Sequence, residues 1–338
     1  MAAKRVLWLD YAKAMSIALV VMMHSVRGVG EAMGGEGFMH ALVAFSDPFR
    51  IPAFFLLAGL LAGRAVAKSW PVLLDRKVAF YAYFYVLWVT IQFAFKAPLA
   101  LDDFGLSSVA QAYALAMINP DTTLWFIAVL PVYFVIAKLT KNMPVTIVLA
   151  AAFLIMAATI ETGWNLIDAG CNGLFFFLLG QRASQQVFEG AERLRGFGVW
   201  TAAFVGVWIV AASLLLDFAI LPGIAVVFAL AGAGGLIGIA VLLERLPLLG
   251  WLRWIGQNTL VIYLAFFLPM AVTRIGLVGI GIIDNIGLVS LIVWLAAMIG
   301  PVILYFAVEK IGFGQFLFKR PAWASTYKPR TGAAQAAE

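Results

Sequence analysis

The stretch LDYAKAMSIALVVMMHSVRG, residues 9–28, is apolar enough to cross a lipid bilayer and yet carries an aspartate, a lysine and a histidine. A charged group in hydrocarbon is costly unless a partner or water stabilises it, so such residues indicate a functional site. Lys4 and Arg5 precede the stretch, as in a signal peptide. No small-residue cleavage site follows His24, and the run is long enough to span. We therefore predict a retained first transmembrane helix.

The composition of the whole chain is that of a membrane protein. Of 338 residues, 64% are hydrophobic and 12% charged, with a mean hydropathy of +1.00, whereas soluble domains carry about 25% charged residues. The net charge of +6 is scattered between apolar runs, which argues against nucleic-acid binding. The single cysteine, Cys171, excludes an intrachain disulfide. The chain has two histidines, which lie far apart and have no carboxylates at ligand spacing, so we expect no metal site.

Apolar runs of spanning length, about 20 residues, occur at ten places in the sequence. They cover residues 7–27, 41–63, 78–95, 122–138, 144–160, 171–187, 198–216, 219–243, 255–273 and 286–308. The fold class is therefore all-α, a polytopic integral membrane protein with about ten transmembrane helices. Residues 1–310 are predicted to form a single transmembrane domain, and residues 311–338 a cytoplasmic tail that is partly disordered.

The distribution of lysine and arginine predicts the orientation in the membrane. Ten spans place both termini on one side. If that side is the cytoplasm, it holds nearly all the basic residues outside the spans, and the other side holds only Arg27, Arg50, Lys96 and Arg274. Cytoplasmic loops are enriched in lysine and arginine. We expect both termini in the cytoplasm and a multi-pass protein of the plasma membrane, the inner membrane of a bacterium.

The charged residues of the first span lie on one face of a helix. Lys13 and His24 are 11 residues apart, which is about 20° beyond three full turns and about 16 Å along the axis. Asp10 is three residues before Lys13 and at ion-pair spacing. One interpretation is a lysine at the interface and a histidine that hydrogen-bonds to a neighbouring helix. The other is a functional polar stripe, such as the proton relay of a transporter.

Several segments carry a family resemblance in the order of the chain. The first, LDYAKAMSIALVVMMH, has ten residues between a basic residue and a histidine. The others are FRIPAFFLLAGLLAGR (49–64), LWFIAVLPVYFVI (124–136), GLFFFLLGQ (173–181) and IGQNTLVIYLAFF (255–267). Together they resemble the acyltransferase-3 family of integral-membrane O-acyltransferases, most closely its sugar O-acetylase-like branch. The chain departs from the family at Lys13, where arginine is commoner, and at Phe266, where many relatives have histidine.

The resemblance implies transfer of an acyl group, acetyl in most cases, from cytosolic acyl-CoA to a hydroxyl of a cell-surface or periplasmic glycan or its precursor. For this reaction we expect His24 to act as general base, since an imidazole with a pKa of about 6.5 suits proton transfer near neutral pH. Lys13, oriented by Asp10, would hold the donor. Arg76 and Lys77 at the cytosolic edge would contact the acyl-CoA phosphates.

The remaining candidate residues would contact substrate. Arg50, close to Asp47 at the start of the second span, either contacts the acceptor or acyl group or forms an interfacial ion pair. Other candidates, including donors to the oxyanion of the transfer step, are Trp125, Asn172, Asn258 and Tyr263. We expect acyl-CoA, a glycan or glycolipid acceptor and the lipid bilayer as partners. Whether the chain forms a homo-oligomer stays open.

Three other functions stay open at this point. A proton-coupled transporter would use Lys13 and His24 as a relay, and a translocating subunit would move an acyl group without transferase chemistry. An inactive membrane scaffold is favoured by the missing histidine at Phe266.

Overall fold

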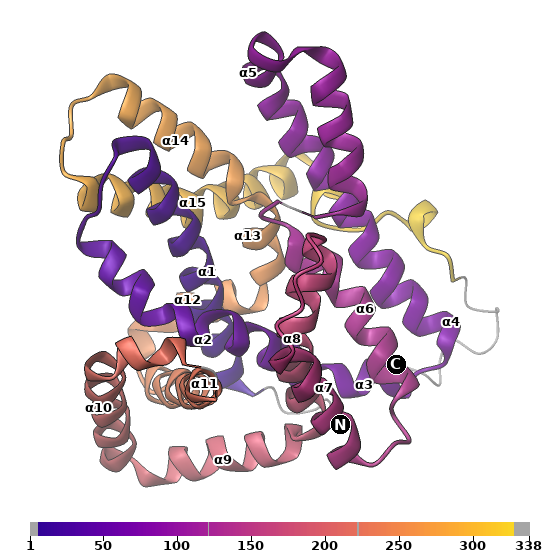
Figure 1. Ribbon diagram of the computed structural model, residues 1–338, viewed down its shortest axis with the longest axis vertical. Helices are drawn as coiled ribbons and strands as arrows, with labels where there is room; N and C mark the ends of the chain where they lie inside the picture. Colours follow the sequence, from indigo (N-terminus) through magenta and orange to yellow (C-terminus); the bar gives the residue numbers. More distant parts are fainter. Residues whose placement is uncertain (1–5, 121, 222, 328–338) are drawn as a thin grey trace.

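The computed structural model describes residues 6–120, 122–221 and 223–327, and every regular element in these ranges is helical (Figure 1). The elements are α1 (Leu7–Met33), α2 (Phe38–Leu60), α3 (Ala62–Ala67), α4 (Trp70–Leu73), the π-helical turn η1 (Leu74–Ala79), α5 (Phe80–Ile118), α6 (Trp125–Leu139), α7 (Val145–Ala157), α8 (Asn165–Arg182), α9 (Ser184–Phe197), α10 (Val199–Leu214), the short 3-10 helices η2 (Leu216–Ile220) and η3 (Pro247–Leu249), α11 (Ile224–Leu243), α12 (Gly250–Gln257), α13 (Thr259–Ala265), α14 (Phe267–Ile280), α15 (Ile286–Ile311), η4 (Gln315–Leu317) and η5 (Ala322–Ala324).

Each of the ten predicted spans corresponds to a helix or a broken helix, which confirms the all-α polytopic class. Among the described residues, five segments are long and apolar enough to cross a membrane: α1, α2, residues 70–98, α11 and α15. Two pairs of consecutive helices are bent where they join, α9–α10 by 111° and α13–α14 by 46°. If each bent pair is counted as one span, the number is seven. Helices α6 and α7 have 15 and 13 residues, fewer than a perpendicular span needs. The number ten therefore stays a prediction.

Helix α5 contains a reversal that the sequence analysis read as a loop. The helix breaks at Gly105, whose φ of 75° and ψ of 163° are not helical. The residues after the break return along the first limb, where the Tyr85 hydroxyl donates to the carbonyl of Ala116 and the hydroxyls of Thr90 and Tyr113 lie 2.8 Å apart. Figure 1 shows the two limbs side by side at the top of the molecule.

Helix α1 is the central element of the bundle. It packs against α2, α11, α12 and α15. Of the residues in its most apolar 18-residue stretch, 61% are buried within the protein. The polar stripe of the first span is therefore inside the bundle and not turned toward lipid.

The loops predicted to be cytoplasmic meet at one end of the bundle. The Lys138 ammonium donates to the carbonyls of Val66, at 2.8 Å, and Lys68. The Arg195 guanidinium pairs with Glu244, with Nε and Oε1 2.6 Å apart. We call this end, where α1 begins, the basic end. Its composition agrees with the predicted topology, while the side of the membrane that it faces stays a prediction.

The segment after α15 packs back onto the basic end. The Trp88 indole donates to the Leu317 carbonyl at 2.9 Å. The Asp75 carboxylate pairs with Arg320 at 2.7 Å and accepts from the backbone amide of Thr326 at 2.6 Å. Of the tail predicted to be partly disordered, residues 312–327 are thus attached to α5 and η1, and residues 328–338 lie outside the described residues.

Candidate functional site

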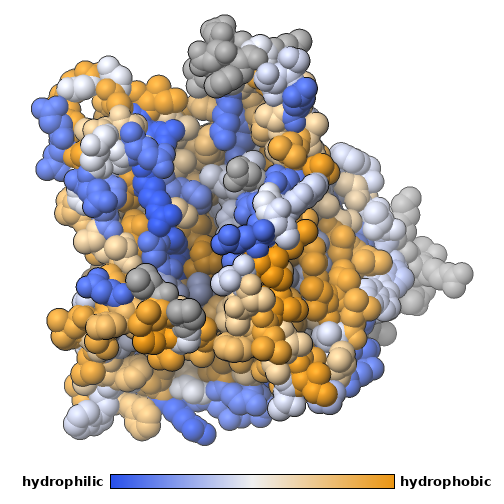
Figure 2. Space-filling model, in the orientation of Figure 1, coloured by the Kyte–Doolittle hydropathy of each residue, from blue (hydrophilic) through white to orange (hydrophobic). Residues whose placement is uncertain are grey.

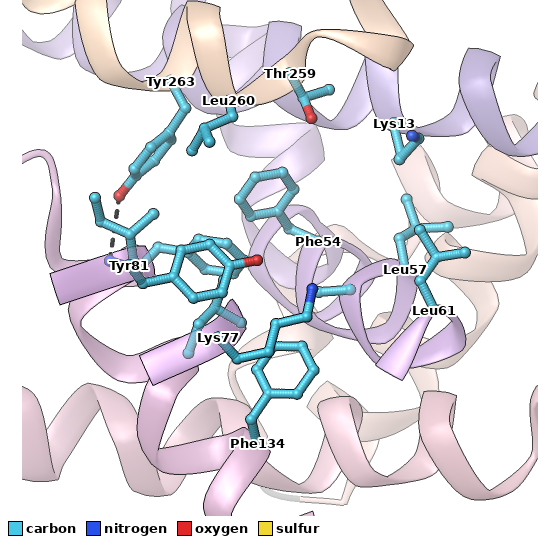
Figure 3. A pocket seen from close by; sticks show the side chains of 14 residues that line it. Lys13, Phe54, Leu57, Leu61, Lys77, Tyr81, Phe134, Thr259, Leu260 and Tyr263 are labelled. Atoms are coloured by element: carbon cyan, nitrogen blue, oxygen red, sulfur yellow. Dashed lines mark hydrogen bonds between the residues drawn. The ribbon is translucent and has the colours of Figure 1, made fainter. Parts of the chain in front are cut away.

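An internal cavity lies between α1, α2, α6, α13 and the start of the η1–α5 segment (Figure 3). Its polar lining consists of Lys13, Lys77, Tyr81, Thr259 and Tyr263. Its other walls are apolar and are formed by Phe54, Leu57, Ala58, Leu61, Phe126, Ile127, Leu130, Phe134 and Leu260. A cavity of this kind suits an apolar chain that carries a few polar groups.

The predicted ion pair of the first helix forms part of this wall. The Lys13 ammonium lies 3.3 Å from Asp10 Oδ1, and the Asp10 side chain is 5% exposed. The Gln257 amide donates to Asp10 Oδ2 at 3.3 Å. The neighbouring Gly256 packs so closely on α1 that a Cβ there would overlap the Asp10 carbonyl. Asp10, the partner of Lys13, is therefore contacted from α12 as well as from its own helix.

Lys77 enters the cavity from the η1 turn, on a different wall from Lys13 (Figure 3). Its ammonium lies 4.8 Å from the ring centroid of Phe134 and 5.9 Å from that of Tyr81. Contacts of this geometry stabilise a cation on an aromatic face. Two cations thus border one largely apolar space.

Two clefts continue the cavity toward the basic end. One shares Lys77 with the cavity, and its other charged residues are Arg64, Lys68, Arg76 and Arg320. The second shares Lys13 and Leu61 with the cavity and Arg64 with the first cleft, and it is also lined by Ser184 and Phe188. We call the five cations Arg64, Lys68, Arg76, Lys77 and Arg320 the basic mouth. The predicted phosphate contacts Arg76 and Lys77 both belong to it.

The cavity ends, away from the basic mouth, at aromatic side chains of α13 and the α13–α14 break. The Tyr263 hydroxyl accepts a hydrogen bond from the Phe126 amide at 3.2 Å and lies at the cavity wall. The Phe266 ring is fully buried, with its centroid 6.4 Å from that of Tyr263 and 5.5 Å from that of His24. His24 is half-buried on the other side of this ring and is not among the residues that line the cavity. Of the stripe from Lys13 to His24, Lys13 thus lines the cavity, while His24 packs against Phe266.

Arg50 takes part in an ion pair, one of its two predicted roles. Its side chain is 5% exposed, its guanidinium lies 2.7 Å from Asp47 Oδ1, and it donates to Ser46 Oγ at 3.2 Å. Arg50 and Arg27 also interact electrostatically with His24. Arg50 thus belongs to the surroundings of His24 and not to the cavity.

Three predicted substrate contacts are not brought to the cavity. Asn172 is exposed on α8. The Asn258 amide donates to the carbonyl of Trp254, one turn earlier, at 2.8 Å. The Trp125 ring packs against Phe55, with centroids 5.8 Å apart. None of the three thus lines this cavity, and their predicted contact with substrate stays a prediction.

The sequence analysis missed five polar lining residues. Tyr81 and Thr259 line the cavity, and Arg64, Lys68 and Arg320 belong to the basic mouth. Arg64 carried a signal, since it ends the motif segment 49–64 and lies near Arg76 in sequence. Arg320 carried none, because only the return of the C-terminal segment brings it to Asp75.

A bundle of apolar helices that encloses a largely apolar cavity with a cationic mouth defines a polytopic membrane protein. The model of the acyltransferase domain family matches residues 6–310, nearly the whole chain. The chain belongs to this family, acyltransferase-3, whose members are membrane acyltransferases. It is 24% identical over 245 residues to the inner membrane protein YcfT of Escherichia coli (strain K12). The aligned region covers 62% of this chain and 67% of YcfT. No solved structure matches the chain.

Proposed function

We propose that this protein is an O-acyltransferase that moves an acyl group, most simply acetyl, from cytosolic acyl-CoA to a hydroxyl of a cell-surface or periplasmic glycan or its precursor. The observation that carries the proposal is the continuity between the basic mouth and the cavity that contains the Lys13–Asp10 pair. Membership of the acyltransferase-3 family supplies the reaction class.

The two parts of this space suit the two parts of an acyl-CoA. Its phosphates match the guanidinium and ammonium groups of the mouth, where Arg64 and Arg76 are exposed. Arginine binds phosphate through two parallel N–H donors, and lysine acts as a point charge. The slender pantetheine arm and its acyl end match the apolar walls beyond Lys77. Lys13 then stands at a position to hold a polar group of the arm.

In the proposed reaction the acceptor oxygen attacks the thioester carbonyl carbon while His24 takes the hydroxyl proton. The ester C–O bond forms, the C–S bond breaks, and the proton passes to the thiolate, so coenzyme A leaves as a thiol and His24 returns to its neutral form. The Phe266 ring packs against both His24 and Tyr263 of the cavity wall. In the proposed reaction this ring moves so that the thioester and the imidazole can meet.

The test uses membranes that contain the full chain and radiolabelled acetyl-CoA. Label is expected in the polysaccharide fraction. Lys13→Met removes the cation beside Asp10 and should lower kcat/KM for acetyl-CoA roughly a hundredfold, as expected for loss of a charged contact of about 3 kcal/mol. Lys13→Arg keeps the charge and the partner, and should retain most activity. Lys141→Met, an exposed lysine of the basic end, is the matched control.

Two results would overturn the proposal. One is membrane flux of a solute with no label in any glycan, which would identify a transporter. The other is transfer by Lys13→Met at the wild-type rate and the wild-type KM, which would remove the cavity from the reaction.

A further inference from the structure

Three arginines lie near the half of α1 that carries His24, at the end opposite the basic end. Arg50 is buried, and its Nε has no hydrogen-bond partner among the described residues. Arg27 lies 2.9 Å from Oδ2 of Asp47, the carboxylate that also pairs with Arg50. One carboxylate thus serves two guanidinium groups.

A third guanidinium comes from α14. A Cβ built on Gly28 would overlap Nη1 of Arg274, so this group rests directly on the backbone of α1. Gly28 is four residues after His24 and therefore lies one turn along on the same face of the helix. Arg274 is half-buried and makes no ion pair with any residue in the described ranges. We call Arg27, Arg50 and Arg274 the arginine site.

The arginine site holds more positive charge than its protein partners neutralise. Arg27 and Arg50 share the carboxylate of Asp47, and Arg274 has no ion pair with a described residue. Glu31, three residues after Gly28 on α1, is exposed and likewise has no ion pair with a described residue. Charges set within a membrane protein are costly unless paired. A ligand that brings its own negative charge would complete the set.

The site can be reached from outside the bundle. Figure 2 shows a hollow between the part of the surface formed by α1 and α14 and the part formed by α5, and hydrophilic residues gather along the α1 wall of this hollow. Arg27, on α1, is accessible to solvent, with a side chain 53% exposed.

We propose that the arginine site binds an oxyanion of the acceptor, the carboxylate of an acidic sugar or a phosphate group, and so places a hydroxyl of the same molecule beside His24. This inference rests on the proposed function, because it names the chemical class of its acceptor. A planar fork of N–H donors fits both oxyanions. An uncharged glycan would leave the excess charge uncompensated.

The test measures binding of three sugars to the full chain in lipid nanodiscs. Glucose, glucuronic acid and glucose 6-phosphate share one ring and differ only at carbon 6. The charged sugars should bind at least roughly tenfold more tightly than glucose, and this difference should shrink as sodium chloride is raised. Tighter binding of glucuronic acid identifies a carboxylate as the group that the site recognises. Tighter binding of glucose 6-phosphate identifies a phosphate.

Arg274→Gln should abolish the preference for the charged sugars. It removes a guanidinium without stripping a partner from Asp47, so the fold should persist. Arg193→Gln, the same change at an exposed position of α9, is the control and should keep the preference. The proposal is overturned if the three sugars bind equally or not at all, or if the preference survives in Arg274→Gln.

This outcome can be separated from failure of the proposed function. Label transfer from acetyl-CoA in the absence of an anion preference would leave the acyltransferase proposal standing and remove the anionic acceptor. An arginine-dependent anion preference without label transfer would leave the anion site standing and remove the acyltransferase proposal.

Discussion

His24 packs against the buried ring of Phe266, with ring centroids 5.5 Å apart. No hydrogen bond between described residues involves its imidazole. In the proposed function this imidazole acts as general base and accepts the proton of the acceptor hydroxyl.

At the residue scale, His24→Ala should therefore lower acyl transfer by about 10²–10⁴-fold, the usual contribution of general base catalysis. The measurement is label transfer from acetyl-CoA at saturating donor, with membrane expression checked in parallel. His40→Ala is the control, because the only other histidine accepts a hydrogen bond from the Gly37 amide at 3.0 Å near the start of α2. Wild-type transfer by His24→Ala would exclude the imidazole as the base.

Single residues also show how far the sequence could be read. The Lys13–Asp10 pair was predictable because an i,i+3 contact is set by helix geometry alone. The contact of Arg274 with Gly28 was not, since it joins helices 246 positions apart in the chain and depends on tertiary packing. The bond of the Asn258 amide to the Trp254 carbonyl was not predicted, although it is a local alternative that any asparagine offers.

At the scale of elements, α12 serves to position the ion pair of α1. Its Gly256 permits backbone contact with Asp10, and its Gln257 bonds to the carboxylate. Gly256→Val would push the two helices apart, displace Lys13 and raise the KM for acetyl-CoA roughly tenfold or more, since misplacement by about 1 Å costs up to 10² in rate. Gly250→Ala, on the same helix with open space around it, is the control. An unchanged KM in Gly256→Val would show that Lys13 does not depend on α12.

The C-terminal segment is a second element whose attachment can be tested. Asp75→Asn removes the charge that pairs with Arg320 in a largely buried site, where side-chain exposures are 11% and 6%. Loss of one partner of a buried pair costs about 3–5 kcal/mol, so residues 315–327 should become sensitive to limited proteolysis.

Lys319→Ala is the control for this release. It breaks the more exposed pair with Glu309, which is worth about 0–1 kcal/mol. Equal protease resistance of Asp75→Asn and the wild-type protein would show that other contacts, such as that of Trp88 with Leu317, hold the segment.

The elements were predictable to the extent that the bilayer fixes their length. Runs of about 20 apolar residues located ten helical segments, because no other structure satisfies the backbone in hydrocarbon. The return of α5 after Gly105 and the docking of residues 312–327 escaped prediction. Both depend on contacts between segments that the local hydropathy does not encode.

At the scale of the whole molecule, the basic end is predicted to face the cytoplasm. In a Cys171→Ser background, an impermeant maleimide should label Glu36→Cys in intact cells, and should label Gly190→Cys only after lysis. Both positions are exposed or surrounded by open space. The expectation follows from the enrichment of lysine and arginine in cytoplasmic loops. Labelling of Gly190→Cys in intact cells would invert the topology and place the basic mouth outside.

The Phe266 ring has a consequence for the cell that contains this protein. A polar path from Lys13 to His24 through the middle of a membrane would, if open, let protons and small ions run down their gradients. Phe266, a large apolar side chain with no exposed surface, packs against both His24 and Tyr263, which lines the cavity. We expect this packing to oppose the leak of ions through the protein when no substrate is bound.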